Sequence, residues 1–161
     1  MKRLCGVVGI SFLLGSCCWF GCKHMQEPVV INILDQELYN DCHIAGSINI
    51  PFEQLELSLD RLDKQAETVV YCSNYQCTAS AHAVRILKEK GFSHVSAYEA
   101  GMAEWYQQKL PVVGACKESY LTVVSKPTGE SLADVPVITT QELKQKIDAA
   151  KTHGHHCTCE Y

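Results

Sequence analysis

The side chains in this sequence with the greatest chemical potential are its cysteines. Ten occur among 161 residues, and four of them lie in or beside an apolar amino-terminal segment. The other six are two close pairs and two single residues: Cys72 with Cys77, Cys157 with Cys159, Cys42 and Cys116. The even spacing of a disulfide scaffold is absent. In an oxidising compartment the close pairs can form disulfides, so the redox state stays open.

Cys72 lies where parallel α/β sheets usually carry their reactive groups. It directly follows the apolar run 69–71, a predicted strand, and a predicted helix begins near Ser80. Backbone N–H groups at a helix amino terminus stabilise a thiolate without a cationic side chain. The loop between them carries small and polar residues and no charge: Ser73, Asn74, Tyr75, Gln76, Cys77, Thr78 and Ala79. N–H dipoles and hydroxyls alone would hold an anionic sulfur donor, or a persulfide on Cys72.

Cys77 has three interpretations at this stage. It is a resolving thiol that attacks a persulfide or sulfenate on Cys72, a disulfide partner of Cys72, or a loop residue without a reactive role. The five-residue spacing lets the two sulfurs meet only if the loop folds back.

A second constellation closes the sequence, where three imidazoles and two thiols lie within residues 153–159. These ligands suit a soft metal, but the Cys157-Thr158-Cys159 spacing is too tight for a standard structural zinc site. Binding of copper or nickel is as plausible, and a terminus without a metal role is the alternative. We assign no metal site and no cofactor.

Strands and helices alternate along the middle of the chain. Apolar, β-branched runs predict strands over 29–34, 47–51, 67–71 and 94–98, and helical spacing predicts helices over 55–62, 80–90 and 102–108. This order predicts an α/β fold with a central, mostly parallel sheet and helices on both faces. After a connector over 117–135, Thr139 and Glu142 have the form of a capping box, and a helix to about residue 150 follows.

The amino terminus is typical of a targeting segment. Lys2 and Arg3 precede an uncharged apolar run over 4–14, too short to span a membrane comfortably. Residues 14–17, Leu-Gly-Ser-Cys, resemble the lipobox of bacterial lipoproteins, in which the cysteine is lipidated. We expect an exported protein, periplasmic or anchored to the membrane by a lipid on Cys17. An uncleaved anchor continuing through Phe20 is the alternative.

Composition limits the number of domains and the classes of partner that the chain can have. With 47% hydrophobic residues, the chain supports one domain with a core and is too short for two full ones. We divide it into a signal segment (1–22), a domain (23–113), a carboxy-terminal extension (114–150) and a His/Cys-rich tail (151–161). A net charge of -4 without a Lys/Arg run argues against a nucleic-acid partner. The oligomeric state is left open.

From about residue 29 to 113, the chain resembles a rhodanese-type sulfurtransferase domain. The likeness rests on the order and spacing of four stretches: 41–51 (DCHIAGSINIP), 69–72 (VVYC), 87–92 (LKEKGF) and 99–105 (EAGMAEW) running on to 110–112 (LPV). It implies the three-layer rhodanese-like fold. It also implies that Cys72 accepts sulfur as a persulfide from a small donor and passes it to cyanide or another thiol. Residues 73–79 would then bind the substrate.

Three departures from the family pattern bear on activity. Asn32 and Leu34 stand where the family usually has an aspartate and an arginine, and Cys42 precedes His43 in place of a glycine. The active loop is about two residues longer and contains Cys77. His43 itself is expected to hold a turn and to take no part in catalysis.

The family domain normally opens with a helix ahead of its first strand, and this chain has almost no room for one. Residues 137–144 (VITTQELK) resemble that opening element but follow the domain. We hypothesise that this helix packs where the amino-terminal one normally does, as in a circular permutation. An ordinary surface helix is the alternative.

The leading hypothesis is therefore a sulfurtransferase that carries sulfane sulfur on Cys72. One rival is a thiol-disulfide or metal-handling protein that uses Cys72, Cys77 and the tail. Another is a non-catalytic binding module on the same fold. A phosphatase is disfavoured because Thr78 stands where an arginine would face the phosphoryl oxygens.

Overall fold

A computed structural model describes residues 27–124, 126 and 134–154, so the predicted signal segment and most of the His/Cys-rich tail lie outside the described residues. The centre of the fold is a four-stranded sheet, all of whose neighbouring strands are parallel, in the order β3-β1-β4-β5. Its strands are β1 (Val29–Asn32), β3 (Ile48–Asn49), β4 (Thr68–Tyr71) and β5 (Val95–Tyr98). A separate antiparallel ribbon pairs β2 (His43–Ile44) with β6 (Val112–Val113).

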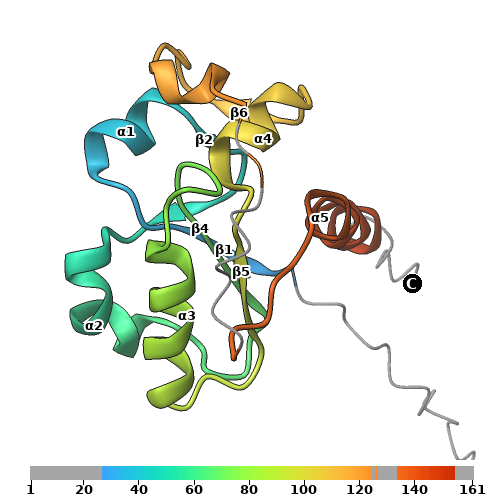
Figure 1. Ribbon diagram of the computed structural model, residues 1–161. Helices are drawn as coiled ribbons and strands as arrows, with labels where there is room; N and C mark the ends of the chain where they lie inside the picture. The colour runs from blue at the N-terminus through green and yellow to red at the C-terminus, as the bar shows by residue number, and fades with distance from the viewer. Residues whose placement is uncertain (1–26, 125, 127–133, 155–161) are drawn as a thin grey trace, which may run out of the picture.

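Helices cover both faces of this sheet, and α3 and α5 lie on opposite sides of it (Figure 1). The α-helices are α1 (Gln36–Asp41), α2 (Leu55–Ser58), α3 (Ala79–Glu89), α4 (Gly101–Gln107) and α5 (Thr140–Gly154). Short 3-10 turns are η1 (Phe52–Gln54), η2 (Leu59–Arg61) and η3 (Ser119–Thr122). The protein has the predicted α/β architecture with a parallel central sheet.

Side chains of β4 alternate between two apolar cores. Val70 and, just past the strand, Cys72 pack with α2 and α3 on one face. Val69 and Tyr71 pack with α4 and α5 on the other face. Successive strand residues point to opposite faces, so a strand covered on both sides is apolar throughout. This alternation directs Cys72 towards α3.

The predicted strands and the helices over 80–90 and 102–108 are present, with ends that differ by a few residues. The single helix predicted over 55–62 is wrong, because the segment forms α2 between the 3-10 turns η1 and η2. Leu55 and Leu59 are its buried residues, and two contacts one turn apart do not require a long regular helix. The sequence also gave no indication of α1, which buries no residue and so has no apolar period.

The carboxy-terminal segment adds to the sheet and to one core. Val137 forms a parallel bridge with Ala97, whose amide donates to Pro136 and whose carbonyl accepts from Ile138. Leu143 and Ile147 of α5 then share a core cluster with Val30 of β1. The capping box is confirmed, since Thr139 and Glu142 exchange side-chain to backbone hydrogen bonds. This packing against β1 is what the circular-permutation hypothesis requires; the permutation itself stays a prediction.

A disulfide joins Cys42 to Cys116, the two cysteines that the sequence left single. Their Cα atoms are 4.6 Å apart, and Cys42 is completely buried. The Asp41 carboxylate accepts hydrogen bonds from the amides of Lys117 and Glu118, and the Asp41 carbonyl accepts one from Cys116. These bonds tie the chain that follows β6 to the end of α1.

Gly101, at the start of α4, permits a close approach of this helix to the loop after β4. Its φ is +63°, and an added Cβ would lie 2.6 Å from the Cys72 carbonyl oxygen and 2.8 Å from the Asn74 nitrogen. Both atoms belong to the backbone, so neither can move away cheaply. The contact brings the amides of Met102 and Ala103 to the carbonyls of Cys72 and Ser73.

We expect Gly101→Ala to lower the free energy of unfolding by roughly 2–4 kcal/mol, because it adds an overlap with backbone to the cost of a positive φ. Gly91→Ala is the matched control: φ is +92° there and nothing lies within 4 Å of the added Cβ. Its cost should be roughly 1–2 kcal/mol, from the backbone alone. Urea unfolding of both variants measures the difference. Equal losses would contradict a tight contact at Gly101.

Candidate active site

Cys72 directly follows β4, at the carboxyl end of that strand, where the chain leads into α3. It is buried, with 1% of its surface exposed. Cys77 is half-buried and packs against the same core cluster. The two form a disulfide, with Cα atoms 6.4 Å apart. The loop therefore folds back on itself. In this oxidised structure, Cys77 is the disulfide partner of Cys72, which was one of its three interpretations.

The loop is shaped by Asn74, which is buried. Its side-chain oxygen accepts a hydrogen bond from the Gln76 amide at 3.0 Å, and its carbonyl accepts one from the Cys77 amide at 3.0 Å. Together the two bonds close a turn that returns the chain towards Cys72. Asn suits this position because its side chain can bond to the backbone two residues on.

The first turn of α4 holds the other side of the loop. The Met102 amide donates to the Cys72 carbonyl at 2.9 Å, and the Ala103 amide donates to the Ser73 carbonyl at 2.9 Å. Both loop carbonyls therefore point towards α4 and away from the space in front of the Cys72 sulfur. The sequence analysis included Gly101, Met102 and Ala103 in the stretch 99–105 that supports the resemblance, but it did not predict their contacts with the loop.

The predicted site residues are brought together in one loop but differ in exposure. Cys72 and Asn74 are buried; Ser73, Tyr75, Cys77 and Ala79 are half-buried; Gln76 and Thr78 are exposed. None of these side chains is charged. The eleven-residue helix α3 begins at Ala79, and the first-turn N–H groups of a helix lack intrahelical acceptors. Such a site can stabilise a compact anion near Cys72.

Ser80 lies in that first turn, with 1% of its surface exposed. Among the described residues, its hydroxyl finds no hydrogen-bond partner. A buried hydroxyl without a partner loses its hydrogen bonds to water, and an anion at the helix terminus would restore one.

Tyr75 connects the loop to the rest of the α4 side. Burial, followed by the nearby Glu104 carboxylate, raises the pKa of Tyr75 to about 12. Thr140, the first residue of α5, donates to Glu104, and its hydroxyl lies 2.9 Å from that of Tyr98. Burial raises the pKa of Tyr98 as well. The active loop, α4 and α5 therefore share one polar network.

The positions that depart from the family pattern make structural contacts. The buried Asn32 side chain accepts a hydrogen bond from the Leu34 amide at 2.8 Å, and Asn49 donates to the Leu34 carbonyl. Asn32 thus shapes the turn after β1 where a charged residue was expected. His43 stacks on Tyr39 and bonds to its carbonyl at 2.8 Å, in agreement with a role in holding a turn.

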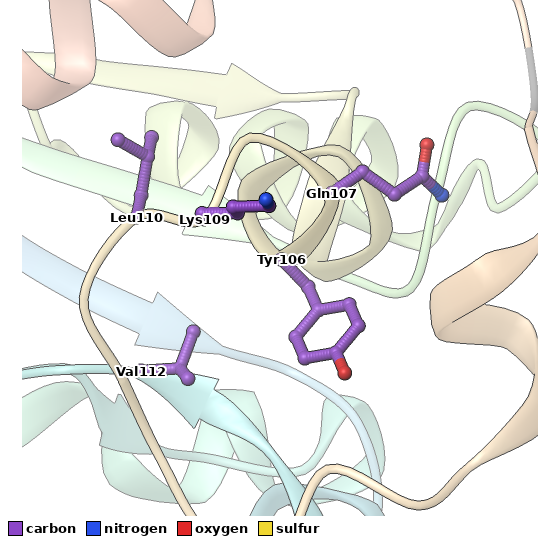
Figure 2. A pocket seen from close by; sticks show the side chains of 5 residues that line it. All are labelled: Tyr106, Gln107, Lys109, Leu110 and Val112. Atoms are coloured by element: carbon purple, nitrogen blue, oxygen red, sulfur yellow. The ribbon is translucent and has the colours of Figure 1, made fainter.

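A surface cavity of about 410 Å³ lies elsewhere, at the end of α4 and the start of β6. Figure 2 shows the five residues that line it: Tyr106, Gln107, Lys109, Leu110 and Val112. No residue of the loop 72–79 lines this cavity, so we assign it no part in the chemistry of Cys72.

The described residues contain neither a metal-binding cluster nor a membrane-spanning helix. Nowhere in 27–124, 126 and 134–154 do three His, Cys, Asp or Glu side chains gather closely enough to hold a metal ion. In the same part of the chain, no helix has both the length and the apolar character needed to cross a bilayer.

Comparison with known proteins points to one family. A family model for the rhodanese-like domain matches residues 22–108. The thiosulfate sulfurtransferase GlpE of Coxiella burnetii is 29% identical over 80 residues, which are 50% of this chain and 73% of that protein. The HTH-type transcriptional regulator Rv0324 of Mycobacterium tuberculosis is 35% identical over 90 residues, which are 56% of this chain but 39% of the regulator.

Among solved structures, the BH2092 protein from Bacillus halodurans matches with a TM-score of 0.53 and 27% identity. The match covers 56% of this chain and 66% of that protein. The chain thus spans less than half of the regulator and about two thirds of the Bacillus halodurans protein.

The ionisation of Tyr75 tests the network. Because its pKa is raised from 10.0 to about 12, the neutral phenol stabilises the fold. That contribution is complete below pH 10 and is lost as pH rises towards 12. We expect Glu104→Gln to lower this pKa part of the way, since it removes the charge but not the burial. The measurement is the phenolate absorbance of each protein against pH, minus that of the same protein carrying Tyr75→Phe.

Glu99→Gln is the matched control. Glu99 acts on Tyr75 only through space and is the weakest of the causes, so its removal should move the titration less. An unchanged titration in Glu104→Gln would show that burial alone sets the pKa of Tyr75.

Proposed function

The chain belongs to the rhodanese-like domain family, and from this premise we propose that it is a sulfurtransferase that carries sulfane sulfur as a persulfide on Cys72. The observation that carries the proposal is the position of Cys72, which directly follows a buried strand and packs in the same core cluster as α3. The relatives named as thiosulfate sulfurtransferases support the choice of chemistry.

In the proposed reaction, the Cys72 thiolate attacks the outer sulfur of a small donor such as thiosulfate. A bond forms between the Cys72 sulfur and that atom, the bond between the two thiosulfate sulfurs breaks, and sulfite leaves with the electron pair. A nucleophile such as cyanide or another thiol then takes the outer sulfur and regenerates the thiolate. The donor and the acceptor are the partners that the proposal requires.

The electrostatics of the loop support an anionic intermediate held without a cationic side chain. No residue from Ser73 to Ala79 is charged, so the stabilisation would come from the amino terminus of α3 and from hydroxyls such as that of Ser80. Fixed dipoles of this kind stabilise charge well because they need no reorganisation when it develops.

Thiol-disulfide exchange is the second candidate, and the disulfide between Cys72 and Cys77 favours it. In that reaction the pair would accept electrons from one dithiol or donate them to another, with no sulfur atom transferred. The two candidates differ in whether reduced Cys72 gains a sulfur atom.

Export belongs to the same proposal. Residues 1–22 would direct the chain out of the cytoplasm, with a lipid on Cys17, into a compartment where disulfides such as Cys42–Cys116 persist. The rhodanese-like domain would then act at the outer side of the cytoplasmic membrane.

The sulfur-carrier proposal predicts that the reduced full chain, freed of reductant and incubated anaerobically with thiosulfate, releases one equivalent of sulfite. Cys72→Ser should release none, because the nucleophile is gone. The measurements are sulfite in solution and the mass of the proteolytic peptide that contains Cys72. Absence of sulfite, together with formation of the Cys72–Cys77 disulfide by an oxidised dithiol, would instead favour thiol-disulfide exchange. Absence of both would indicate a non-catalytic module.

Lipid attachment has its own test. Cells that express the chain and grow on labelled palmitate should incorporate label into the protein, and Cys17→Ser should abolish it because the acceptor thiol is missing. Cys18→Ser, which changes the adjacent thiol, should keep the label. An unlabelled wild-type protein in the cytoplasmic fraction would contradict the proposal.

A further inference from the structure

Cys77 is placed to react with whatever Cys72 carries. The turn made by Asn74 brings the two Cα atoms to 6.4 Å, within the range that a disulfide spans. The hydrogen bonds from the Gln76 and Cys77 amides to Asn74 and from the Met102 amide to Cys72 are all present while the sulfurs are joined. The disulfide therefore forms without breaking any of these hydrogen bonds.

We propose that Cys77 is a resolving thiol that attacks the persulfide and expels the carried sulfur as hydrosulfide, an inference that rests on the proposed persulfide at Cys72. The Cys77 thiol loses its proton to solvent and attacks the inner sulfur, Cys72 Sγ. The bond between the two cysteine sulfurs forms, and the bond from Cys72 Sγ to the outer sulfur breaks. The outer sulfur takes up a proton from solvent and leaves with the electron pair as hydrosulfide.

The electrons balance within the loop. Two thiols are oxidised to one disulfide, and one sulfane sulfur is reduced to sulfide. An external dithiol must then reduce the disulfide before the next turnover. The activity becomes the dithiol-dependent reduction of sulfane sulfur to sulfide, and the disulfide in the structure is the product of its second step.

Burial favours Cys77 over an acceptor from solution. Cys72 is 1% exposed with the disulfide in place, which leaves little surface for a second molecule to approach. Cys77 is already beside it, and a positioned nucleophile reacts as if at very high concentration. The same difference in exposure directs the reductant, because Cys77 is the more exposed residue of the disulfide. Attack there releases Cys72 as a thiolate at the amino terminus of α3, where the helix dipole stabilises it.

Comparison with the Cys42–Cys116 disulfide argues against a purely structural role for Cys72–Cys77. A crosslink removes more entropy from the unfolded chain when it closes a longer loop. Cys42–Cys116 spans 74 residues, whereas Cys72–Cys77 spans 5. The short crosslink adds little to the constraint that strand β4 and helix α3 already impose on its ends.

The test is a single turnover of the full chain, reduced, freed of reductant and mixed anaerobically with one equivalent of thiosulfate. The wild type should release sulfite and then an equal amount of sulfide, and its peptides should contain the Cys72–Cys77 disulfide. Cys77→Ser should still release sulfite, because Cys72 is retained, and should keep the extra sulfur on Cys72, with sulfide released at least about tenfold more slowly. Cys77→Ala should behave like Cys77→Ser. Cys157→Ser, which removes a thiol of the tail, should behave like the wild type.

The two failures are distinguishable. Sulfite without sulfide in the wild type, or equally fast sulfide from Cys77→Ser, would overturn the role of Cys77 and leave the persulfide proposal intact. A wild type that releases neither would overturn both. Far-ultraviolet circular dichroism of each variant checks that it is folded, and the sulfite burst of Cys77→Ser or Cys77→Ala confirms that Cys72 is still functional.

Discussion

The hydrogen bonds from the Met102 and Ala103 amides to the carbonyls of Cys72 and Ser73 are the contact on which the candidate site depends. They join the ends of two neighbouring parallel strands, β4 and β5, through the first turn of α4. Only a residue without a side chain fits between them, because a Cβ at Gly101 would overlap the Cys72 carbonyl. With these carbonyls turned towards α4, the backbone after β4 starts its path to α3 with its orientation fixed. The sulfur of Cys72 is then directed into the core on the α3 side.

The carboxy-terminal segment supports this arrangement from the other face of the sheet. Its bridge to Ala97 extends the edge at β5, and Leu143 and Ile147 fill the core that contains Tyr71. Thr140 donates to Glu104, and the same carboxylate raises the pKa of Tyr75, so the start of α5 and the active loop both interact with one carboxylate. A segment more than sixty residues from Cys72 along the chain thus takes part in holding its loop, which neither the matched range 22–108 nor the loop sequence reveals.

The local sequence predicted a strand or helix wherever the burial of that element alone sets its pattern of apolar residues. The run Val69–Tyr71 indicated a strand buried on both faces, and the position of Cys72 followed from it. Contacts between distant segments were not predictable in this way. The pairing of Cys42 with Cys116 depends on how α1 and the chain after β6 pack, and neither has an apolar period. The spacing of Cys72 and Cys77 left their pairing open, since Asn74 could be identified as the turn residue only once its bonds were seen. From the sequence, Asn32 was only a neutral residue at a position where the family usually has a charged one. In the structure its buried side chain accepts the hydrogen bond that shapes the turn after β1.

A neutral loop and a buried sulfur together constrain the chemistry more than either does alone. Without a cationic side chain, the loop holds an anion only through N–H dipoles and hydroxyls, which favours a compact charge at the Cys72 sulfur itself. In the disulfide form Cys72 is 1% exposed, which leaves a bulky thiol from solution little access to it. A thiol within the loop meets both constraints: it is small, it is already inside, and it is neutral until it loses its proton. The longer loop with its second cysteine therefore has one consequence: the thiol that attacks the persulfide lies on the same chain and does not come from solution.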